Sequence, residues 1–256
     1  MIDLTALIIT YNEEPNIKRV LEKLQWIDKV IILDSGSSDN TLSIVEQFKN
    51  TEVHYRKFDS FAEQCNYGLN LITTSWTLSL DADYVLADAL IAEMKQVLSN
   101  PDKDAYKAAF RFCVFGYPLR SDNTTPRPIL FKTQSGIYEN DGHAHRLKLQ
   151  GSSGTFTNKI LHDDRKELDR WFRNQEKYSL QESQKLIAKS NKDLRNIDKI
   201  RKLKWLAPFL VFFYCLFVKG LILDGWYGWH YTLQRTIVEM MFALRLIEEE
   251  KLKKNA

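Results

Sequence analysis

The chain has 256 residues, of which 44% are hydrophobic and 12% aromatic, so it can bury a sizeable core and is not a disordered chain. Its formal net charge of +3 is too small to indicate a nucleic-acid partner, and we expect none. Three scattered cysteines without metal-ligand spacing favour reduced thiols in a cytosolic protein. The first residues run directly into a strand pattern without a basic segment, so we expect no signal peptide.

Strand and helix patterns alternate over the first third of the chain. Short β-rich apolar runs predict strands, and apolar residues at helical spacing or a capping box predict the helices between them. The predicted strands are Leu4–Thr10, Lys29–Leu33, Glu52–Arg56 and Trp76–Leu80, and the predicted helices are Asn16–Leu24, Thr41–Phe48 and a segment from Ser60 to about Leu71. This alternation predicts an α/β fold with a doubly wound, parallel sheet.

The stretch Trp76–Tyr84 ends a buried strand in two carboxylates, Asp81 and Asp83. Alternate residues of an extended segment share a face, so both can point the same way. Ligands of open α/β sheets bind at this carboxyl edge, and a carboxylate pair suits Mg²⁺ or Mn²⁺ that also holds phosphates. A turn in which Asp83 or Asp88 caps the next helix is the alternative, and the pair alone favours it. The choice therefore depends on the N-terminal residues.

The loop Asp34–Asp39 follows the second predicted strand and is rich in glycine and serine. It lacks the lysine and the glycine spacing of a phosphate-binding loop. An acidic residue at this position can instead hydrogen-bond the polar edge or the ribose of a nucleoside. Turns and helix caps would explain Ser38 and Asp39, but they leave Asp34 without a role.

Three motifs at predicted strand ends resemble those of the family 2 glycosyltransferases, in particular the branch that builds the lipopolysaccharide core and cell-surface glycans. They are ITYNEE at 9–14, LDSGSSDNT at 33–41 and LDAD at 80–83. The resemblance implies the nucleotide-binding GT-A fold and a metal-bound diphosphate between Asp81 and Asp83. The donor-binding residues that we predict from it are Thr10, Tyr11, Glu13, Asp34, Gly36 and Asp81.

From Pro101 onward the alternation breaks, and we predict strands Tyr106–Cys113 and Pro128–Phe131 joined by the loop Val114–Arg127. A turn dense in ionisable groups, Glu139–Arg146, then opens the strand Leu147–Leu149.

The resemblance implies that an acidic residue in this turn accepts the proton of the acceptor hydroxyl. The lipopolysaccharide-core branch often has His-Glu here, whereas this chain has Asp141-Gly-His-Ala-His. Asp141 is therefore our candidate base. His143 or His145 is an alternative base, because imidazole titrates near neutral pH, and a solvated β-turn without a catalytic role is another.

His162 closes a short predicted strand, where it can complete the metal shell, contact phosphate or serve the structure alone. The helix Glu167–Lys189 follows, with Trp171, Phe172, Tyr178 and Leu186 predicted toward the core. The Gln-x-x-Arg-Trp element of processive synthases is incomplete, because Glu167 stands where the glutamine belongs. This difference argues against a processive polymerase.

The last third begins with a basic run, Lys189–Lys204, before the apolar segment Trp205–Leu223. That segment is about long enough to cross a bilayer, which takes ~20 residues, but a proline, a lysine and a glycine interrupt it. Trp and Tyr residues follow, as at membrane interfaces. An amphipathic helix, Tyr231–Glu249, then carries apolar side chains at Leu233, Ile237, Met240, Met241, Leu244 and Ile247. We predict a peripheral or monotopic membrane element, with a buried helix of a homodimer as the alternative.

The sequence thus predicts a nucleotide-sugar-binding half at 1–100, an acceptor and catalytic half at 101–166, and a helical membrane-associated region at 167–256. The predicted activity is transfer of a hexosyl-type group from a UDP-linked donor to a lipid-linked or lipopolysaccharide-type acceptor. Mg²⁺ or Mn²⁺, held by Asp81, Asp83 and His162, assists at the cytoplasmic face of the inner (plasma) membrane. Inversion of configuration is implied by the resemblance alone.

Two other functions remain open from the sequence. A catalytically silent membrane scaffold would keep the fold and bind nucleotide. A nucleotidyltransferase would have a glycine-rich basic loop after the first strand, where this chain has Tyr11–Pro15.

Overall fold

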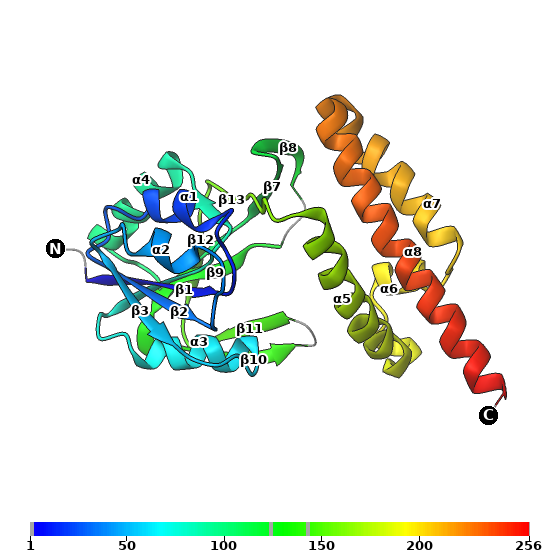
Figure 1. Ribbon diagram of the computed structural model, residues 1–256, viewed down its shortest axis with the longest axis horizontal. Helices are drawn as coiled ribbons and strands as arrows, with labels where there is room; N and C mark the ends of the chain where they lie inside the picture. Colours follow the sequence, from blue (N-terminus) through cyan, green and yellow to red (C-terminus); the bar gives the residue numbers. More distant parts are fainter. Residues whose placement is uncertain (1–2, 123–124, 142–143, 256) are drawn as a thin grey trace. The chain divides into compact units, whose positions relative to one another are not determined.

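The computed structural model describes residues 3–122, 125–141 and 144–255, and the chain divides into two compact units (Figure 1). Unit 1 comprises Met1–Pro118 and Asp122–Lys166, and unit 2 comprises Leu119–Ser121 and Glu167–Ala256. The finer division of the chain into three functional regions stays a prediction.

Unit 1 is built on a seven-stranded sheet in the order β12-β6-β9-β4-β1-β2-β3. Its strands are β1 (Leu4–Thr10), β2 (Lys29–Asp34), β3 (Thr51–Tyr55), β4 (Trp76–Asp81), β6 (Ala105–Ala108), β9 (Arg127–Lys132) and β12 (Ser153–Thr155). Strands β4, β1, β2 and β3 are parallel, whereas β9 runs antiparallel to β4 and β6. The predicted α/β fold, with a parallel sheet built by the first third of the chain, is confirmed.

Helices cover both faces of the sheet, as Figure 1 shows: α1 (Ile17–Glu22), α2 (Thr41–Val45) and α4 (Asp88–Ser99) on one face, α3 (Phe61–Asn70) on the other. Successive residues of β1 therefore enter two different cores. Ile8 packs in the cluster that includes α1 and α4, and Leu7 packs in the cluster that includes α3. A strand buried on both faces must be apolar throughout, which is why β1 and β2 read as continuous hydrophobic runs. The Ser60 hydroxyl accepts the Glu63 N–H at 3.3 Å, so the predicted cap of α3 is present.

Several predictions in the second half of unit 1 are wrong. The predicted strand Tyr106–Cys113 is divided into β6 and β7 (Phe110–Val114), which belong to different sheets. The predicted loop Val114–Arg127 contains β8 (Tyr117–Asp122), which forms a hairpin with β7. Its two-residue turn has Phe115 at φ 49° and Gly116 at φ 85°, and a turn with both central residues at positive φ suits the twist of two antiparallel strands.

A four-stranded sheet has the order β5-β13-β7-β8, in which β5 (Tyr84–Leu86) and β13 (Ile160–His162) precede β7. Its strands belong to unit 1 except for Leu119–Ser121 of β8. A separate hairpin pairs β10 (Gly136–Asp141) with β11 (Ala144–Leu149), after the short 3₁₀ helix η1 (Thr133–Ser135). The predicted turn Glu139–Arg146 was therefore too long, because Glu139 and Arg146 already face each other in this ladder.

Unit 2 is helical. It contains α5 (Leu168–Ala188), η2 (Asn191–Asp193), α6 (Asn196–Arg201), α7 (Leu206–Phe213), a π-helical turn η3 (Tyr214–Val218), η4 (Leu221–Asp224) and α8 (Gly225–Asn255). Gly220, at φ 68°, separates η3 from η4, as a residue without a Cβ can do at no steric cost. On α5, Leu186 is buried as predicted and Trp171 and Tyr178 are half-buried, but Phe172 is exposed, so that prediction is wrong.

Helix α8 has two apolar faces. The face packed within unit 2 carries Val238, Phe242, Ala243 and Leu246. The stripe predicted from the sequence lies elsewhere on the helix, with Leu233, Met240 and Leu244 exposed. Within the described residues no single helix is long and apolar enough to span a membrane, although Leu206–Val218 and Leu221–Leu252 pass this test as a pair bent by 69°.

Candidate active site

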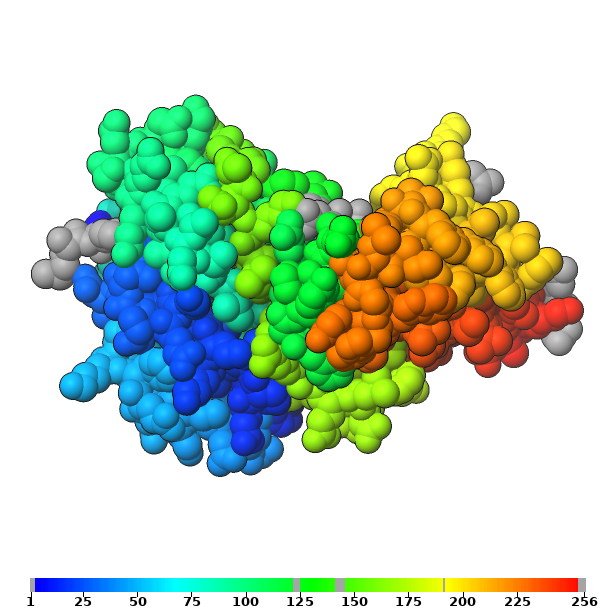
Figure 2. Space-filling view, turned by 90° about the horizontal axis from the view of Figure 1, so that it is seen from above, coloured from blue at the N-terminus to red at the C-terminus, as the bar shows by residue number. Residues whose placement is uncertain are grey.

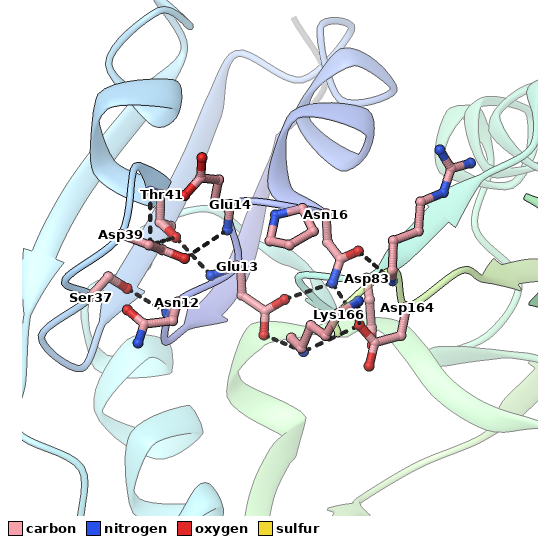
Figure 3. A network of polar contacts seen from close by, with 12 residues as sticks. Asn12, Glu13, Glu14, Asn16, Ser37, Asp39, Thr41, Asp83, Asp164 and Lys166 are labelled. Carbon is pink, nitrogen blue, oxygen red and sulfur yellow. Dashed lines mark hydrogen bonds and ion pairs between the residues drawn. The ribbon is translucent and has the colours of Figure 1, made fainter. Parts of the chain in front are cut away.

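The loops that follow β1 and β2 are joined by hydrogen bonds at the carboxyl edge of the sheet (Figure 3). Three successive N–H groups of the first loop donate to side chains of the second. These bonds run from Asn12 to Ser37 Oγ at 2.8 Å, from Glu13 to Thr41 Oγ1 at 2.7 Å and from Glu14 to Asp39 Oδ2 at 3.2 Å. Asn12 adopts φ 55°, a left-handed conformation that asparagine tolerates better than most residues, and its Oδ1 accepts the Ser38 N–H at 2.7 Å.

The carboxylate of Asp34, at the end of β2, accepts several hydrogen bonds that hold the second loop in place. Its side chain is 2% exposed, and Oδ1 accepts the N–H groups of Gly36 and Ser37, each at 2.8 Å. Oδ2 accepts the hydroxyl groups of Thr10 at 2.9 Å and Ser37 at 2.5 Å. Gly36 adopts φ 97°, which favours glycine at this position. These bonds give Asp34 a structural role that the sequence did not reveal, and its contact with a nucleoside stays a prediction.

Two more predicted donor-binding residues differ sharply in exposure. Tyr11 is 53% exposed at the edge, so its ring is accessible to a ligand. Thr10 is buried, and its hydroxyl donates to Asp34. It therefore stabilises the loop after β2 and is not exposed to a ligand. Both roles in donor binding stay predictions.

Asp83 and His162 lie together, as predicted for a shared site. Asp83 Oδ2 and His162 Nε2 are 3.1 Å apart, joining the end of β4 to the end of β13. Burial raises the pKa of Asp83, but the neighbouring His162 and Lys166 more than offset this effect, so the pKa lies below its ordinary value. Burial likewise lowers the pKa of His162, and Asp83 with other carboxylates outweighs it, so that pKa is raised. Each of the two groups thus shifts the pKa of the other toward the charged form.

A divalent cation suits only part of the predicted ligand set. Within the ranges that the structure describes, no group of three or more His, Cys, Asp or Glu side chains could hold a metal ion, so Asp81 does not join Asp83 and His162 in such a cluster. Asp83 Oδ1, however, is buried without a hydrogen-bond partner among the described residues. Because Mg²⁺ usually takes one or two carboxylates and completes its shell with phosphates and waters, this oxygen with His162 fits a metal that arrives with the donor.

The segment after His162 supplies site residues that the sequence analysis missed. Asp163 is buried, accepts the Gly116 N–H at 3.0 Å, and forms ion pairs with Arg19 and Arg165. Asp164 and Glu13 both accept the side-chain amide of Asn16, at 2.9 and 3.0 Å. Lys166 Nζ lies 2.7 Å from Glu13 Oε1 (Figure 3). The signal for this cluster was the run His-Asp-Asp-Arg-Lys directly after a predicted strand.

The candidate base lies at the tip of the β10–β11 hairpin. Asp141 ends β10 opposite Ala144, but its side chain and that of His145 lie outside what the structure describes, as does all of His143. The body of the hairpin is anchored to α3, because Asn66 donates to Tyr138 O at 3.0 Å and accepts the Tyr138 N–H at 2.8 Å. The Tyr138 hydroxyl also lies 2.8 Å from Ser79 Oγ on β4. The hairpin is thus attached to the same strand that carries the acidic pair.

A model of the family described as glycosyl transferase family 2 matches residues 5–164, well over half of the chain. The chain belongs to this family. The match extends beyond the first third that carried the three motifs and reaches Asp164 in the segment after β13.

Similar proteins agree with this assignment. The lipopolysaccharide core biosynthesis glycosyltransferase LpsC of Rhizobium meliloti (strain 1021) is 24% identical over 98% of this chain and 94% of its own length. An uncharacterized glycosyltransferase of Rickettsia felis is 32% identical over 41% of this chain and 37% of its own. Among solved structures, S. aureus TarS 1–349 in complex with UDP-GlcNAc shares the fold, with a TM-score of 0.51 and 15% identity over 93% of this chain and 81% of that one. The chain is a glycosyltransferase, which favours the enzyme over the silent scaffold and the nucleotidyltransferase.

The geometry around Asp34 leads to a prediction about stability. Asp34→Asn keeps the shape of the side chain, but an amide NH₂ then faces donors that need an acceptor, so the variant should lose about 1–3 kcal/mol of unfolding free energy. Chemical denaturation of the variant checks this, with the exposed carboxylate of Asp88 changed to asparagine as the control. Unchanged stability combined with lost nucleotide binding would show that Asp34 acts on the ligand instead.

Proposed function

We propose that this glycosyltransferase moves a sugar from a UDP-linked donor to a lipid-linked or lipopolysaccharide-type acceptor, with inversion, at the cytoplasmic face of the inner membrane. The observation that carries the donor half is the arrangement at the carboxyl ends of neighbouring strands: the loops after β1 and β2 are hydrogen-bonded to each other, and the Asp83–His162 pair follows β4, which lies beside β1. The names of LpsC and of the TarS complex with UDP-GlcNAc support the acceptor class and the donor base.

In this proposal the exposed ring of Tyr11 stacks on the base. The N–H groups of 12–14 are already engaged by the second loop, so the edge is rigid before the donor arrives. Such rigidity lowers the entropic cost of binding. Asp83 Oδ1 and His162 would hold Mg²⁺ or Mn²⁺ beside the diphosphate, where the ion supplies charge neutralisation for the leaving group.

Asp141 is the proposed base. It accepts the proton of the acceptor hydroxyl while that oxygen bonds to the anomeric carbon from the side opposite the departing diphosphate. The attachment of the hairpin through Asn66 and Tyr138 sets where this carboxylate can reach. His143 and His145 remain the competing bases.

The proposed membrane contact rests on unit 2. Along α7 and η3 the exposed side chains recur at helical spacing and are all apolar or aromatic: Leu206, Phe209, Leu210, Phe213, Tyr214, Phe217 and Val218. A second such stripe runs along α8, with Trp226, Trp229, Leu233, Met240 and Leu244 exposed, and Figure 2 shows α7 and the start of α8 at the surface of this unit. Large exposed apolar patches mark interaction sites, and a bilayer interface favours Trp and Tyr.

Between residues 194 and 247 the exposed charged side chains are all basic. Between residues 194 and 247 the acidic residues are Asp198, Asp224 and Glu239, and all three are buried in ion pairs. Lys199 and Lys202 are exposed. A surface on which the acidic side chains are buried and the lysines are exposed suits binding to anionic lipid. Arg201 is different, because it pairs with buried Glu239 at 2.9 Å and lies over the ring of Phe242.

The metal proposal predicts that Asp83→Ala abolishes transfer and also removes any enhancement of nucleotide binding by Mg²⁺ or Mn²⁺, because an anionic oxygen ligand is lost. Activity assays and calorimetric titration with UDP, each with and without the ion, check this. Full activity of the unaltered protein in excess chelator would contradict the metal role.

The base proposal predicts that Asp141→Asn lowers turnover by about 10²-fold or more while donor binding stays near normal, since the amide cannot accept a proton. Parallel assays of His143→Ala and His145→Ala serve as controls. If one of these histidine variants shows the loss and Asp141→Asn does not, the base is that histidine.

The membrane proposal predicts that the double variant Lys199→Gln with Lys202→Gln binds anionic vesicles more weakly than the unaltered protein. Added salt should make the two vesicle affinities more alike, because it screens the charges. Trp205→Ser with Phe209→Ser should weaken binding even at high salt, because it removes apolar burial. Vesicle flotation measures both. A full-length protein that ignores vesicles and forms a dimer would instead support the buried dimer helix.

A further inference from the structure

Lys166 lies among the carboxylates of the candidate site (Figure 3). Its Nζ is 2.7 Å from Glu13 Oε1 and 3.6 Å from Asp164 Oδ1, and its side chain is only 12% exposed. Burial lowers the pKa of Lys166. The carboxylates of Glu13, Asp164 and Asp83 raise it by more, so the pKa lies above its ordinary value and the lysine is charged. It is a buried cation placed where the donor half of the site converges.

A donor diphosphate meets an electrostatic problem at this edge. Glu13, Asp81, Asp83 and Asp164 are acidic, and the diphosphate is anionic as well. Like charges a few ångströms apart repel strongly away from bulk water. A cation at the place where they meet lowers this cost, and a lysine ammonium on a flexible stem can change partners among several oxygens.

The neighbours of Lys166 are arranged so that it can leave Glu13. Asn16 Nδ2 donates to Glu13 Oε2 at 3.0 Å and to Asp164 Oδ1 at 2.9 Å, so each carboxylate has a second donor. The Lys166 N–H also donates to Asp164 Oδ1 at 3.1 Å, which fixes the backbone of the lysine while its side chain moves.

We propose that Lys166 binds the diphosphate of the donor, and that the ion pair with Glu13 keeps the lysine side chain in this position when no donor is bound. This inference rests on the proposed function. During transfer the bond between the anomeric carbon and the bridging phosphate oxygen breaks, and its electron pair stays on that oxygen. The acceptor oxygen forms the new bond to carbon, and its proton passes to the base. Lys166 stabilises the negative charge that grows on the departing diphosphate.

Binding measurements separate this role from a structural one. Calorimetric titration with uridine, UMP and UDP compares the unaltered protein with Lys166→Gln and Lys166→Arg. Lys166→Gln should weaken UDP binding by about tenfold or more and leave uridine within about twofold, because only the phosphates meet the lost charge. Lys166→Arg keeps the charge and should retain most of the affinity for UDP.

The control is Lys23→Gln, which removes another ion-paired lysine of unit 1, 2.6 Å from Asp88 at the surface. It should change none of the three affinities. If Lys166→Gln does not fold, the paired variant Glu13→Gln with Lys166→Gln replaces it, because it leaves no unpaired charge.

Three outcomes would overturn the inference. Unchanged UDP binding in Lys166→Gln would show that the lysine does not touch the diphosphate. An equal loss for uridine and UDP would show that Lys166 only positions Glu13. An unaltered protein that binds none of the three ligands would contradict the proposed donor class and this inference with it, so the two failures are distinguishable.

Discussion

Repulsion between carboxylates is the constraint on which the candidate site depends. Glu13, Asp83, Asp163 and Asp164 come from three distant parts of the chain and meet in unit 1. The segment 162–166 offsets much of this repulsion, because it supplies His162 to Asp83, Arg165 to Asp163 and Lys166 to Glu13. Arg19 and Asn16 supply the other partners from around α1. Each of these four acids is therefore paired or hydrogen-bonded, as buried charges must be.

The same pairing explains how unit 1 joins its early and late halves. Asp163 receives Arg19 from α1 and the Gly116 N–H from the turn between β7 and β8, so one buried carboxylate connects three segments. Removing one partner of such a group leaves a charge without compensation, which costs more than the pair contributes. The donor site and the stability of the second sheet are thus linked through one short run of residues.

Much of the fold followed from local sequence. The strands β1 and β2 are apolar on both faces, and Ser60 and Glu63 mark the start of α3, so strand–helix alternation was readable. The β7–β8 hairpin was missed because its turn places Phe115 at positive φ, a conformation that the sequence does not predict for phenylalanine. Gly116 was the one residue of this turn that favours positive φ. On α8 the sequence showed an apolar stripe but not which of two apolar faces would pack, since that choice depends on α5 and α7. The candidate site was predicted where it followed strand ends and missed at Asn16, Arg19 and Lys166, whose roles come from contacts between segments up to about 150 residues apart.

The account rests on a nucleotide-sugar site at the carboxyl edge of unit 1, and backbone hydrogen exchange with and without UDP-GlcNAc, repeated with UDP alone, tests it most directly. The account predicts slower exchange at 11–16, 34–41, 81–84 and 162–166, because these segments surround the proposed donor. Protection confined to other segments, or no change at saturating ligand in the presence of Mg²⁺, would contradict it.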